Sequence, residues 1–263
     1  IGREPWFRLE PVPGLVDCDG WCYVPALLGP GERVYAFGVG TSVGFERELA
    51  SRCGVVVDLF DPSPASVAWI GFQTLPPALT FHAWAVAAAD GTLRLAARAG
   101  GEGRPVMYSA VDASRTGDAV EVDALTIGSI RARLGHGPIA MVKLDVEGVE
   151  FDVLPQVLAL DPLPRQVLAE FHHRFPGLGP DRARRAVAAL RAAGYRLAWL
   201  SATGREFTFV RPHWGRPGVR VPPALAGVPP FPAPATGGAP HRLPVRERPG
   251  LAPLRAGGRA PHR

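Results

Sequence analysis

The chain has 263 residues, of which 47% are hydrophobic, and a formal net charge of +5 at pH 7. This length allows one medium-sized α/β domain with a sizeable core, and no apolar run reaches the roughly 18–20 residues that a membrane-spanning helix needs. Nine Arg and one acid give residues 211–263 a charge of +8 and leave −3 for the rest, so the charge does not favour a nucleic-acid-binding domain.

The composition divides the chain into three segments. Residues 1–30 are rich in Pro, Gly and Trp and lack a clear period, and we expect a lead-in there with at most one short helix. Residues 31–211 are expected to form the folded domain. Residues 212–263 are rich in Pro, Arg and Gly and contain few apolar clusters, which predicts a disordered tail.

From residue 33 the chain alternates between buried strands and amphipathic helices. Short apolar runs predict strands at 34–37, 55–60, 79–89, 119–125, 139–144, 166–171, 195–201 and 206–210. Helices are predicted at 42–53, 126–134, 149–160 and 181–193, with another opening at 61–64. This alternation predicts an α/β fold, with a mostly parallel sheet, helices on both faces and a closing antiparallel hairpin.

A glycine turn follows the first of these strands, with Gly38, Gly40, Ser42 and Gly44 in the sequence GVGTSVG. Glycines let the backbone turn sharply and approach a ligand closely, and the helix that follows offers free N–H groups to an anion. That anion is pyrophosphate in dinucleotide enzymes and can be the methionine carboxylate in methyltransferases. A tight structural turn is the alternative explanation.

Asp61 ends the second strand, 21 residues after Gly40. A carboxylate at this place can accept hydrogen bonds from both hydroxyls of a ribose. The alternative is that Asp61 caps the helix that begins at Pro62. Asp58 is a rival for the ribose, but it lies inside the strand.

The segment 143–150, with the sequence KLDVEGVE, begins at the end of the predicted strand 139–144 and places Lys143, Asp145 and Glu147 at one strand end. Doubly wound sheets bind their ligands at the carboxyl ends of the strands. Lys143 is the only Lys among 29 Lys and Arg residues. A single retained Lys indicates a position where a guanidinium does not replace an ammonium, although chance survival would also explain it.

The next strand ends with Glu170 and His172, which alternation places on one face. His is a candidate general base near neutral pH. A metal site formed by Asp145, Glu147, Glu170 and His172 is conceivable. We expect no metal, because a histidine that only caps the strand explains the pattern at least as well.

Together these residues resemble the FkbM family of S-adenosylmethionine-dependent methyltransferases, over about 34–210. The most specific part is the segment 143–150, similar to the family's K-[IL]-D-[VI]-E-G-x-E, and the segments FDPSP at 60–64 and EFH at 170–172 are similar to other family motifs. The turn departs from the family's D-x-G-x-N-x-G, because Gly38 and Ser42 stand at the Asp and Asn positions. The turn resembles instead a branch of animal and algal methyltransferase-like proteins.

The resemblance implies a Rossmann-like class I methyltransferase fold with a seven-stranded sheet and S-adenosylmethionine as methyl donor. It implies a hydroxyl on a small molecule or glycan as acceptor. Gly38, Gly40, Gly44 and Asp61 would hold the cofactor, with Ser42 in the turn and Glu46 supplying the missing carboxylate. Asp145 would lie nearest the methyl group and the acceptor. His172 or Glu147 would take the acceptor's proton, with Lys143 and Glu170 beside them.

Two other function classes stay open. A nicotinamide-dependent oxidoreductase shares the glycine turn and the acid after the second strand, but it leaves the segments 143–150 and 170–172 unexplained. A methyltransferase fold without activity could serve as a binding module, since the motif Asp is replaced by Gly38. We do not expect a nucleic-acid partner, and the sequence does not indicate the oligomeric state.

Overall fold

The computed structural model describes residues 7–99, 105–109, 119–175 and 177–211. The predicted tail, 212–263, lies outside the described residues. Within the part that is described, no helix has the combination of length and hydropathy that crossing a bilayer requires.

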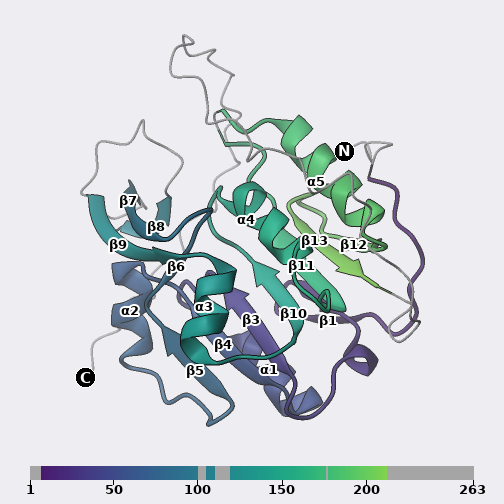
Figure 1. The fold of residues 1–263 in the computed structure, drawn as a ribbon, viewed down its shortest axis with the longest axis horizontal. Coiled ribbons are helices and arrows are strands. Elements are labelled where there is room, and N and C mark those ends of the chain that lie inside the picture. Colours follow the sequence, from purple (N-terminus) through teal and green to yellow (C-terminus); the bar gives the residue numbers. More distant parts are fainter. Residues whose placement is uncertain (1–6, 100–104, 110–118, 176, 212–263) are drawn as a thin grey trace, which may run out of the picture. The chain divides into compact units, whose positions relative to one another are not determined.

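The main sheet has seven strands in the order β12-β13-β11-β10-β3-β4-β5 (Figure 1). Five neighbouring strands are parallel: β3 (Arg33–Phe37), β4 (Val56–Phe60), β5 (Leu79–His82), β10 (Ile139–Leu144) and β11 (Gln166–Glu170). The strands β12 (Arg196–Leu200) and β13 (Glu206–Val210) form an antiparallel hairpin beside β11. The predicted fold class, a mostly parallel seven-stranded α/β sheet with a closing hairpin, is confirmed.

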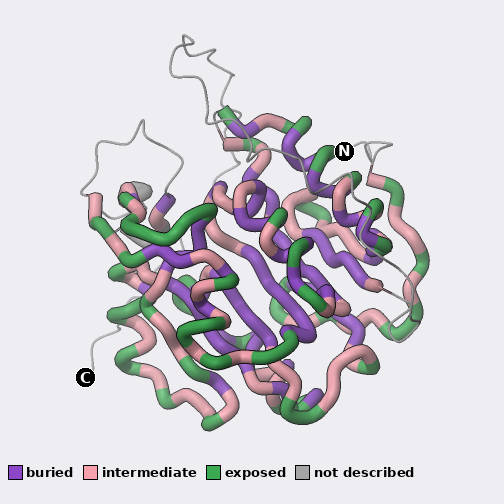
Figure 2. Tube along the Cα trace, viewed as in Figure 1, coloured by how far each residue is buried: buried purple, intermediate pink, exposed green. Residues whose placement is uncertain are grey.

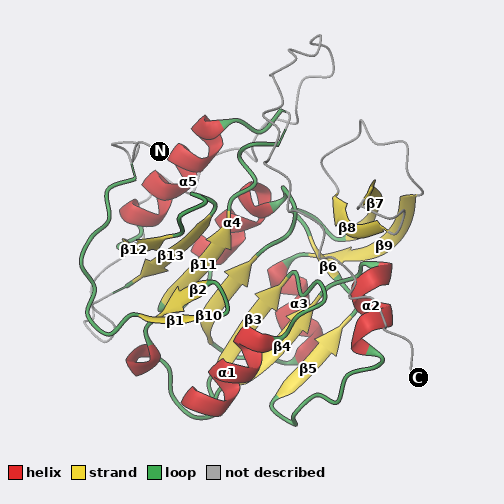
Figure 3. Cartoon of the chain, turned by 180° about the vertical axis from the view of Figure 1, so that it is seen from behind, coloured by secondary structure: helices red, strands yellow, loops and turns green. Residues whose placement is uncertain are grey.

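Helices cover both faces of this sheet. The helices are α1 (Gly44–Cys53), α2 (Pro64–Ile70), α3 (Ile127–Leu134), α4 (Glu150–Leu158) and α5 (Pro180–Ala192). Side chains alternate along β3, so that Tyr35 and Phe37 join the core under α3, α4 and α5, and Val34 joins the core under α1. Figure 2 shows the resulting buried band through the central strands, and Figure 3 shows α1 on the opposite face from α3 and α4.

A second, four-stranded sheet has the order β6-β9-β7-β8. Its strands are β6 (Ala85–Val86), β7 (Gly91–Ala99), β8 (Pro105–Ser109) and β9 (Ala119–Leu125). The predicted single strand over 79–89 is wrong, because β5 ends in the main sheet and β6 pairs with β9 in the second. A continuous apolar run does not reveal where a chain leaves one sheet for another.

The lead-in carries a hairpin that is not among the predicted elements. The strands β1 (Val16–Cys18) and β2 (Trp21–Tyr23) are antiparallel, and a short 3-10 helix, Pro25–Leu27, follows them. The turn between the strands has φ of 49° at Asp19 and 82° at Gly20, as Asp-Gly hairpin turns require. The rings of Trp21 and Tyr23 pack against Phe45 of α1, so this part of the lead-in belongs to the core.

Asp58 does not compete with Asp61 for a ligand. It is buried inside β4, where Arg33 Nη1 donates to its Oδ2 at 2.5 Å and His82 Nε2 lies 2.9 Å from its Oδ1. Burial alone would raise the pKa of Asp58, but the hydrogen bonds from His82 and Arg33 outweigh burial and lower this pKa. The carboxylate is therefore held by Arg33 and His82 inside the protein and does not line the cavity described below.

We expect Asp58→Asn to lower the free energy of unfolding by about 2 kcal/mol at neutral pH, because charge-assisted hydrogen bonds are lost. The lowered folded-state pKa means that ionised Asp58 stabilises the fold above its unfolded pKa, and that this contribution disappears as the pH falls through the folded pKa. Urea denaturation of both proteins at about pH 7 and about pH 3 measures the difference. If the difference in the free energy of unfolding between the two proteins were as large at about pH 3 as at about pH 7, this role of Asp58 would be contradicted.

Candidate active site

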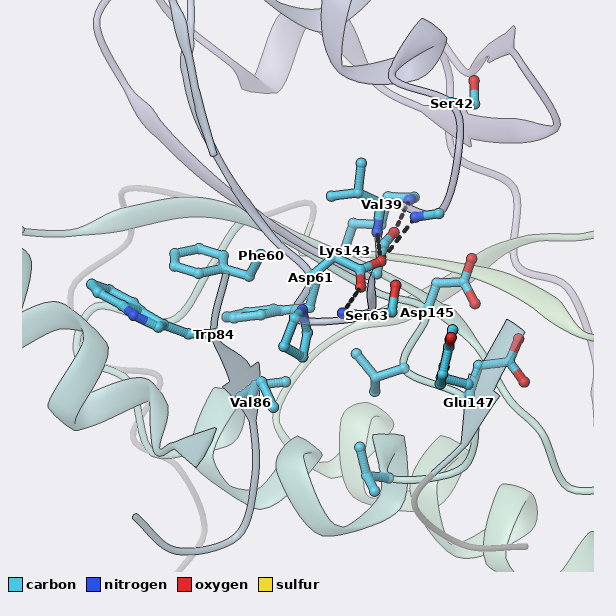
Figure 4. A pocket seen from close by; sticks show the side chains of 18 of the residues that line it. Val39, Ser42, Phe60, Asp61, Ser63, Trp84, Val86, Lys143, Asp145 and Glu147 are labelled. Atoms are coloured by element: carbon cyan, nitrogen blue, oxygen red, sulfur yellow. Dashed lines mark hydrogen bonds between the residues drawn. The ribbon is translucent and has the colours of Figure 1, made fainter. Parts of the chain in front are cut away.

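A cavity of about 380 Å³ lies at the carboxyl ends of β3, β4 and β10, between the main sheet and the second sheet. Its lining includes all of the following: Trp21, Phe37, Gly38, Gly40, Ser42, Glu46, Phe60, Asp61, Trp84, Val86, Leu93, Leu95, Tyr108, Lys143, Asp145 and Glu147. Figure 4 shows Phe60, Trp84 and Val86 at one end, and Asp145 and Glu147 at the other. The cavity therefore has an aromatic end and an acidic end.

Gly38 and Gly40 both adopt positive φ, at 83° and 57°, but their surroundings differ. A Cβ on Gly38 would lie 1.7 Å from the carbonyl oxygen of Asp145, whereas a Cβ on Gly40 would meet no atom within 4 Å. The chain passes so close to Asp145 because Gly38 N–H donates to Phe60 O, and Asp145 N–H donates to Phe37 O. A glycine is thus required at position 38 because the strand ends pack closely there, and at position 40 only because of the positive φ.

Asp61 ties the glycine turn to the end of β4. Its Oδ2 accepts hydrogen bonds from Val39 N–H at 3.0 Å, Gly40 N–H at 2.9 Å and Ser66 Oγ at 2.8 Å. Its Oδ1 accepts one hydrogen bond, from Ser63 N–H at 2.9 Å (Figure 4). The N-cap of α2 is Ser63 rather than Asp61. Asp61 therefore fixes the turn, and only Oδ1 keeps capacity for a further donor.

Lys143 and Glu46 form a buried ion pair beside the cavity, with 3.3 Å between Nζ and Oε1. Lys143 Nζ also donates to Gly38 O at 3.3 Å and lies 5.1 Å from the centre of the Trp21 ring. Burial would lower the pKa of Lys143, but the carboxylates of Glu46 and Asp145 outweigh burial and raise it. The ammonium is therefore held charged inside the protein.

Glu150 is a site residue that the sequence analysis did not assign. Its buried Oε1 accepts hydrogen bonds from Val146 N–H and Gly148 N–H and lies 2.7 Å from His172 Nδ1. It thereby holds the loop in which Glu147 adopts a left-handed φ of 53°. In the sequence, Glu150 is the last residue of the acidic segment 143–150. A Glu at this position is also common at the start of a helix, so the sequence does not show that its side chain binds the preceding loop.

His172 and Glu170 do not line the cavity; they lie behind Asp145, at the end of β11. Burial opposes the charged imidazole, but Glu150, Glu147 and Glu170 outweigh burial and raise the pKa of His172 to about 9. Burial and the neighbouring Asp145 raise the pKa of Glu170 to about 7. Burial also raises the pKa of Asp145, against the attraction of Lys143 and His172. His172 is mostly protonated at neutral pH, which does not favour it as a base.

The aromatic end is built from rings that sequence reasoning did not assign to the site. Phe60 stacks on Phe37 with 4.7 Å between ring centres and on His82 with 4.9 Å, and His82 stacks on Trp84 with 5.0 Å. Trp84 lies just after β5, but the predicted strand over 79–89 included it, so nothing in the sequence indicates that its ring lies at a strand end.

Ser42 and Gly44 lie at the other side of the turn, next to the β1-β2 hairpin. Ser42 Oγ donates to Asp19 Oδ2 at 3.3 Å, and a Cβ on Gly44 would lie 2.5 Å from the same oxygen. Figure 4 shows Ser42 apart from the acidic end. The structure therefore gathers Gly38, Asp61 and Asp145 closely, and leaves Ser42 at the rim.

Comparison with solved structures returns methyltransferases of low similarity. The complex between the Haloferax volcanii Trm112 methyltransferase activator and its methyltransferase gives 12% identity, covers 71% of this chain and 85% of that chain, and has a TM-score of 0.36. The antibiotic-resistance methyltransferase Kmr is 14% identical, with a TM-score of 0.35, and the match covers 75% of this chain and 99% of that chain. A variant of the 16S rRNA (adenine(1408)-N(1))-methyltransferase from Catenulisporales acidiphilia is 14% identical, with a TM-score of 0.35, and the match covers 80% of this chain and 100% of that chain.

No curated protein sequence matches the chain significantly. Residues 18–197, which span most of the chain, match the methyltransferase FkbM domain. The match covers the glycine turn, both acidic strand ends and the second sheet, and so includes every element that lines the cavity. The chain is therefore a member of the FkbM methyltransferase domain family.

Proposed function

We propose that the protein transfers the methyl group of S-adenosylmethionine to a hydroxyl of a small molecule or glycan. The observation that carries this proposal is the two-ended cavity beside the glycine turn, with aromatic rings at one end and the carboxylates of Asp145 and Glu147 at the other. A volume of about 380 Å³ falls within the range of ligand pockets.

The residues present fit this cofactor. The rings of Phe60 and Trp84 offer an apolar surface for the adenine, and Asp61 Oδ1 can accept from one ribose hydroxyl. Gly38 lies so close to Asp145 that no side chain fits there, so the turn presents only its backbone to the cofactor at this position. Glu46 stands where a carboxylate can receive the ammonium of the methionine moiety, which would compensate for the Gly at the motif position.

When bound, the cofactor supplies an electrophilic methyl group on a sulfonium. The residues of this chain then have to align the acceptor and receive its proton. Asp145 and Glu147 are the carboxylates at the acidic end of the cavity, so we assign Asp145 to orienting the hydroxyl and Glu147 to accepting the proton. His172 and Glu170 support them from behind, and Lys143 offsets the negative charge near Asp145.

Calorimetric titration with S-adenosylhomocysteine, compared with NAD(H), tests the cofactor assignment. Saturable binding of the first without binding of the second supports methyl transfer. Binding of NAD(H) alone would favour an oxidoreductase, and binding of neither would favour a module without activity. Incubation with S-adenosylmethionine and a panel of hydroxyl acceptors, followed by mass spectrometry, then tests for methylated product.

We expect Asp61→Ala to weaken binding of S-adenosylhomocysteine at least about tenfold, because the variant loses the ribose acceptor and the anchor of the turn. The matched control is Ser66→Ala, which removes one hydrogen bond to the same carboxylate and should change the affinity less than about threefold. Calorimetry on the folded variants measures both. Unchanged affinity in Asp61→Ala would remove Asp61 from the proposed site.

A further inference from the structure

Behind the acidic end of the cavity, adjacent parallel strands bring together Asp145, Glu170 and His172. Asp145 follows β10, and Glu170 and His172 come from the end of β11. One possible ligand atom from each of the three lies within 4.8 Å of those of the other two. Two ligands of one hard divalent cation lie at most about 4–5 Å apart, since each is about 2.1–2.4 Å from the ion. One ion can therefore contact all three side chains.

The imidazole of His172 is the observation that distinguishes this cluster from ordinary acidic groups. His172 is 3% exposed, and its Nδ1 lies 2.7 Å from Glu150 Oε1. Its Nε2 faces Glu170 Oε1 at 3.6 Å and Glu147 Oε2 at 3.7 Å, which is beyond hydrogen-bonding distance. A buried His that is fixed by a carboxylate through one nitrogen, with the other turned toward oxygen ligands, has the arrangement of a metal-binding His and its outer-shell partner.

We propose that Asp145, Glu170 and His172 bind a divalent cation, and that His172 Nε2 releases its proton to solvent when the ion binds. Carboxylate oxygens suit Mg²⁺, Ca²⁺ and Mn²⁺, and an imidazole shifts the preference toward first-row transition ions, so the mixed set suits Mn²⁺ best. The carboxylates of Asp145, Glu147, Glu150 and Glu170 lie around the imidazole, and two other cations offset part of their charge: Lys143 near Asp145, and Arg205, whose Nη1 lies 3.1 Å from Glu170 Oε1. The sequence alone favoured strand-end capping; the mutual distances favour a metal site.

A cation held by Asp145 would lie at the acidic end of the cavity, where it could draw a hydroxyl oxygen of the acceptor and ease the loss of its proton. This consequence rests on the proposed function, but cation binding itself does not.

Titration of the full chain with Mn²⁺, followed by the electron paramagnetic resonance signal of the free ion, tests the site without cofactor or acceptor. We expect one saturable site, and an affinity at least about tenfold lower in Asp145→Asn and in Glu170→Gln. Glu46→Gln is the matched control, because it removes another buried carboxylate from the same cavity that is not a ligand. Its affinity should stay within about threefold of the original.

The absence of saturable Mn²⁺ binding to the unaltered chain would overturn the proposal, even if no variant folds. An equal loss in Glu46→Gln and Glu170→Gln would also overturn it, because general negative charge would then explain the binding. Circular dichroism confirms that each variant is folded. A negative Mn²⁺ titration would not change the expected binding of S-adenosylhomocysteine, so the metal site and the proposed methyl transfer are tested independently.

Discussion

Gly38→Ala is expected to lower the free energy of unfolding by about 2–5 kcal/mol and to abolish cofactor binding. The new methyl group would lie 1.7 Å from Asp145 O, a backbone atom that cannot move without breaking the hydrogen bond from Asp145 N–H to Phe37 O. Overpacking of this kind costs about 1–3 kcal/mol, and a left-handed φ in Ala adds about 1–2 kcal/mol. Urea denaturation measures the sum.

Gly40→Ala separates the two causes. Gly40 also has positive φ, but the added methyl group would meet nothing within 4 Å, so only the backbone cost of about 1–2 kcal/mol is expected. The difference between the variants is then the cost of forcing apart the ends of β3 and β10. Equal losses in both variants would show that the contact with Asp145 has no special weight.

The sequence predicts the main sheet well because each of its strands is a separate apolar run between helices. The predicted strands 34–37, 139–144 and 206–210 coincide with β3, β10 and β13 to within one residue. The second sheet was not predicted as a sheet, since its pairs join β6 to β9 across some forty residues of chain. Pairing between distant segments leaves no periodic signal within either one.

The sequence predicts which residues reach the candidate site when they directly follow a strand. It does not predict the role of a residue when that role depends on contacts with distant parts of the chain. The strand ends place Asp61 and Asp145 at the cavity, as the sequence predicts. The contacts of Asp61 with the amides of Val39 and Gly40 depend on how the turn folds over β4, which spacing does not reveal. Similarly, the pKa of His172 depends on carboxylates brought in by α4 and by the loop before it.

The buried pair of Lys143 and Glu46 should show the second large effect. Lys143→Met is expected to lower the free energy of unfolding by about 3–5 kcal/mol, because it leaves the carboxylate of Glu46, itself 2% exposed, without its cation. The double variant Glu46→Gln with Lys143→Met should recover part of this loss, since no uncompensated charge stays buried. Urea denaturation of both single variants and the double variant gives the coupling free energy.

Lys143→Arg tests why this chain keeps one Lys among so many Arg. The ammonium is enclosed by Glu46, the carbonyl of Gly38 and the Trp21 ring, in a space that suits a compact cation. We therefore expect Lys143→Arg to keep the charge but still destabilise the fold by about 1–3 kcal/mol, through overpacking. Full stability in Lys143→Arg, or strictly additive losses in the double variant, would mean that the pair contributes little. Such a result would leave the retention of this lysine to be explained by contact with the bound ligand instead.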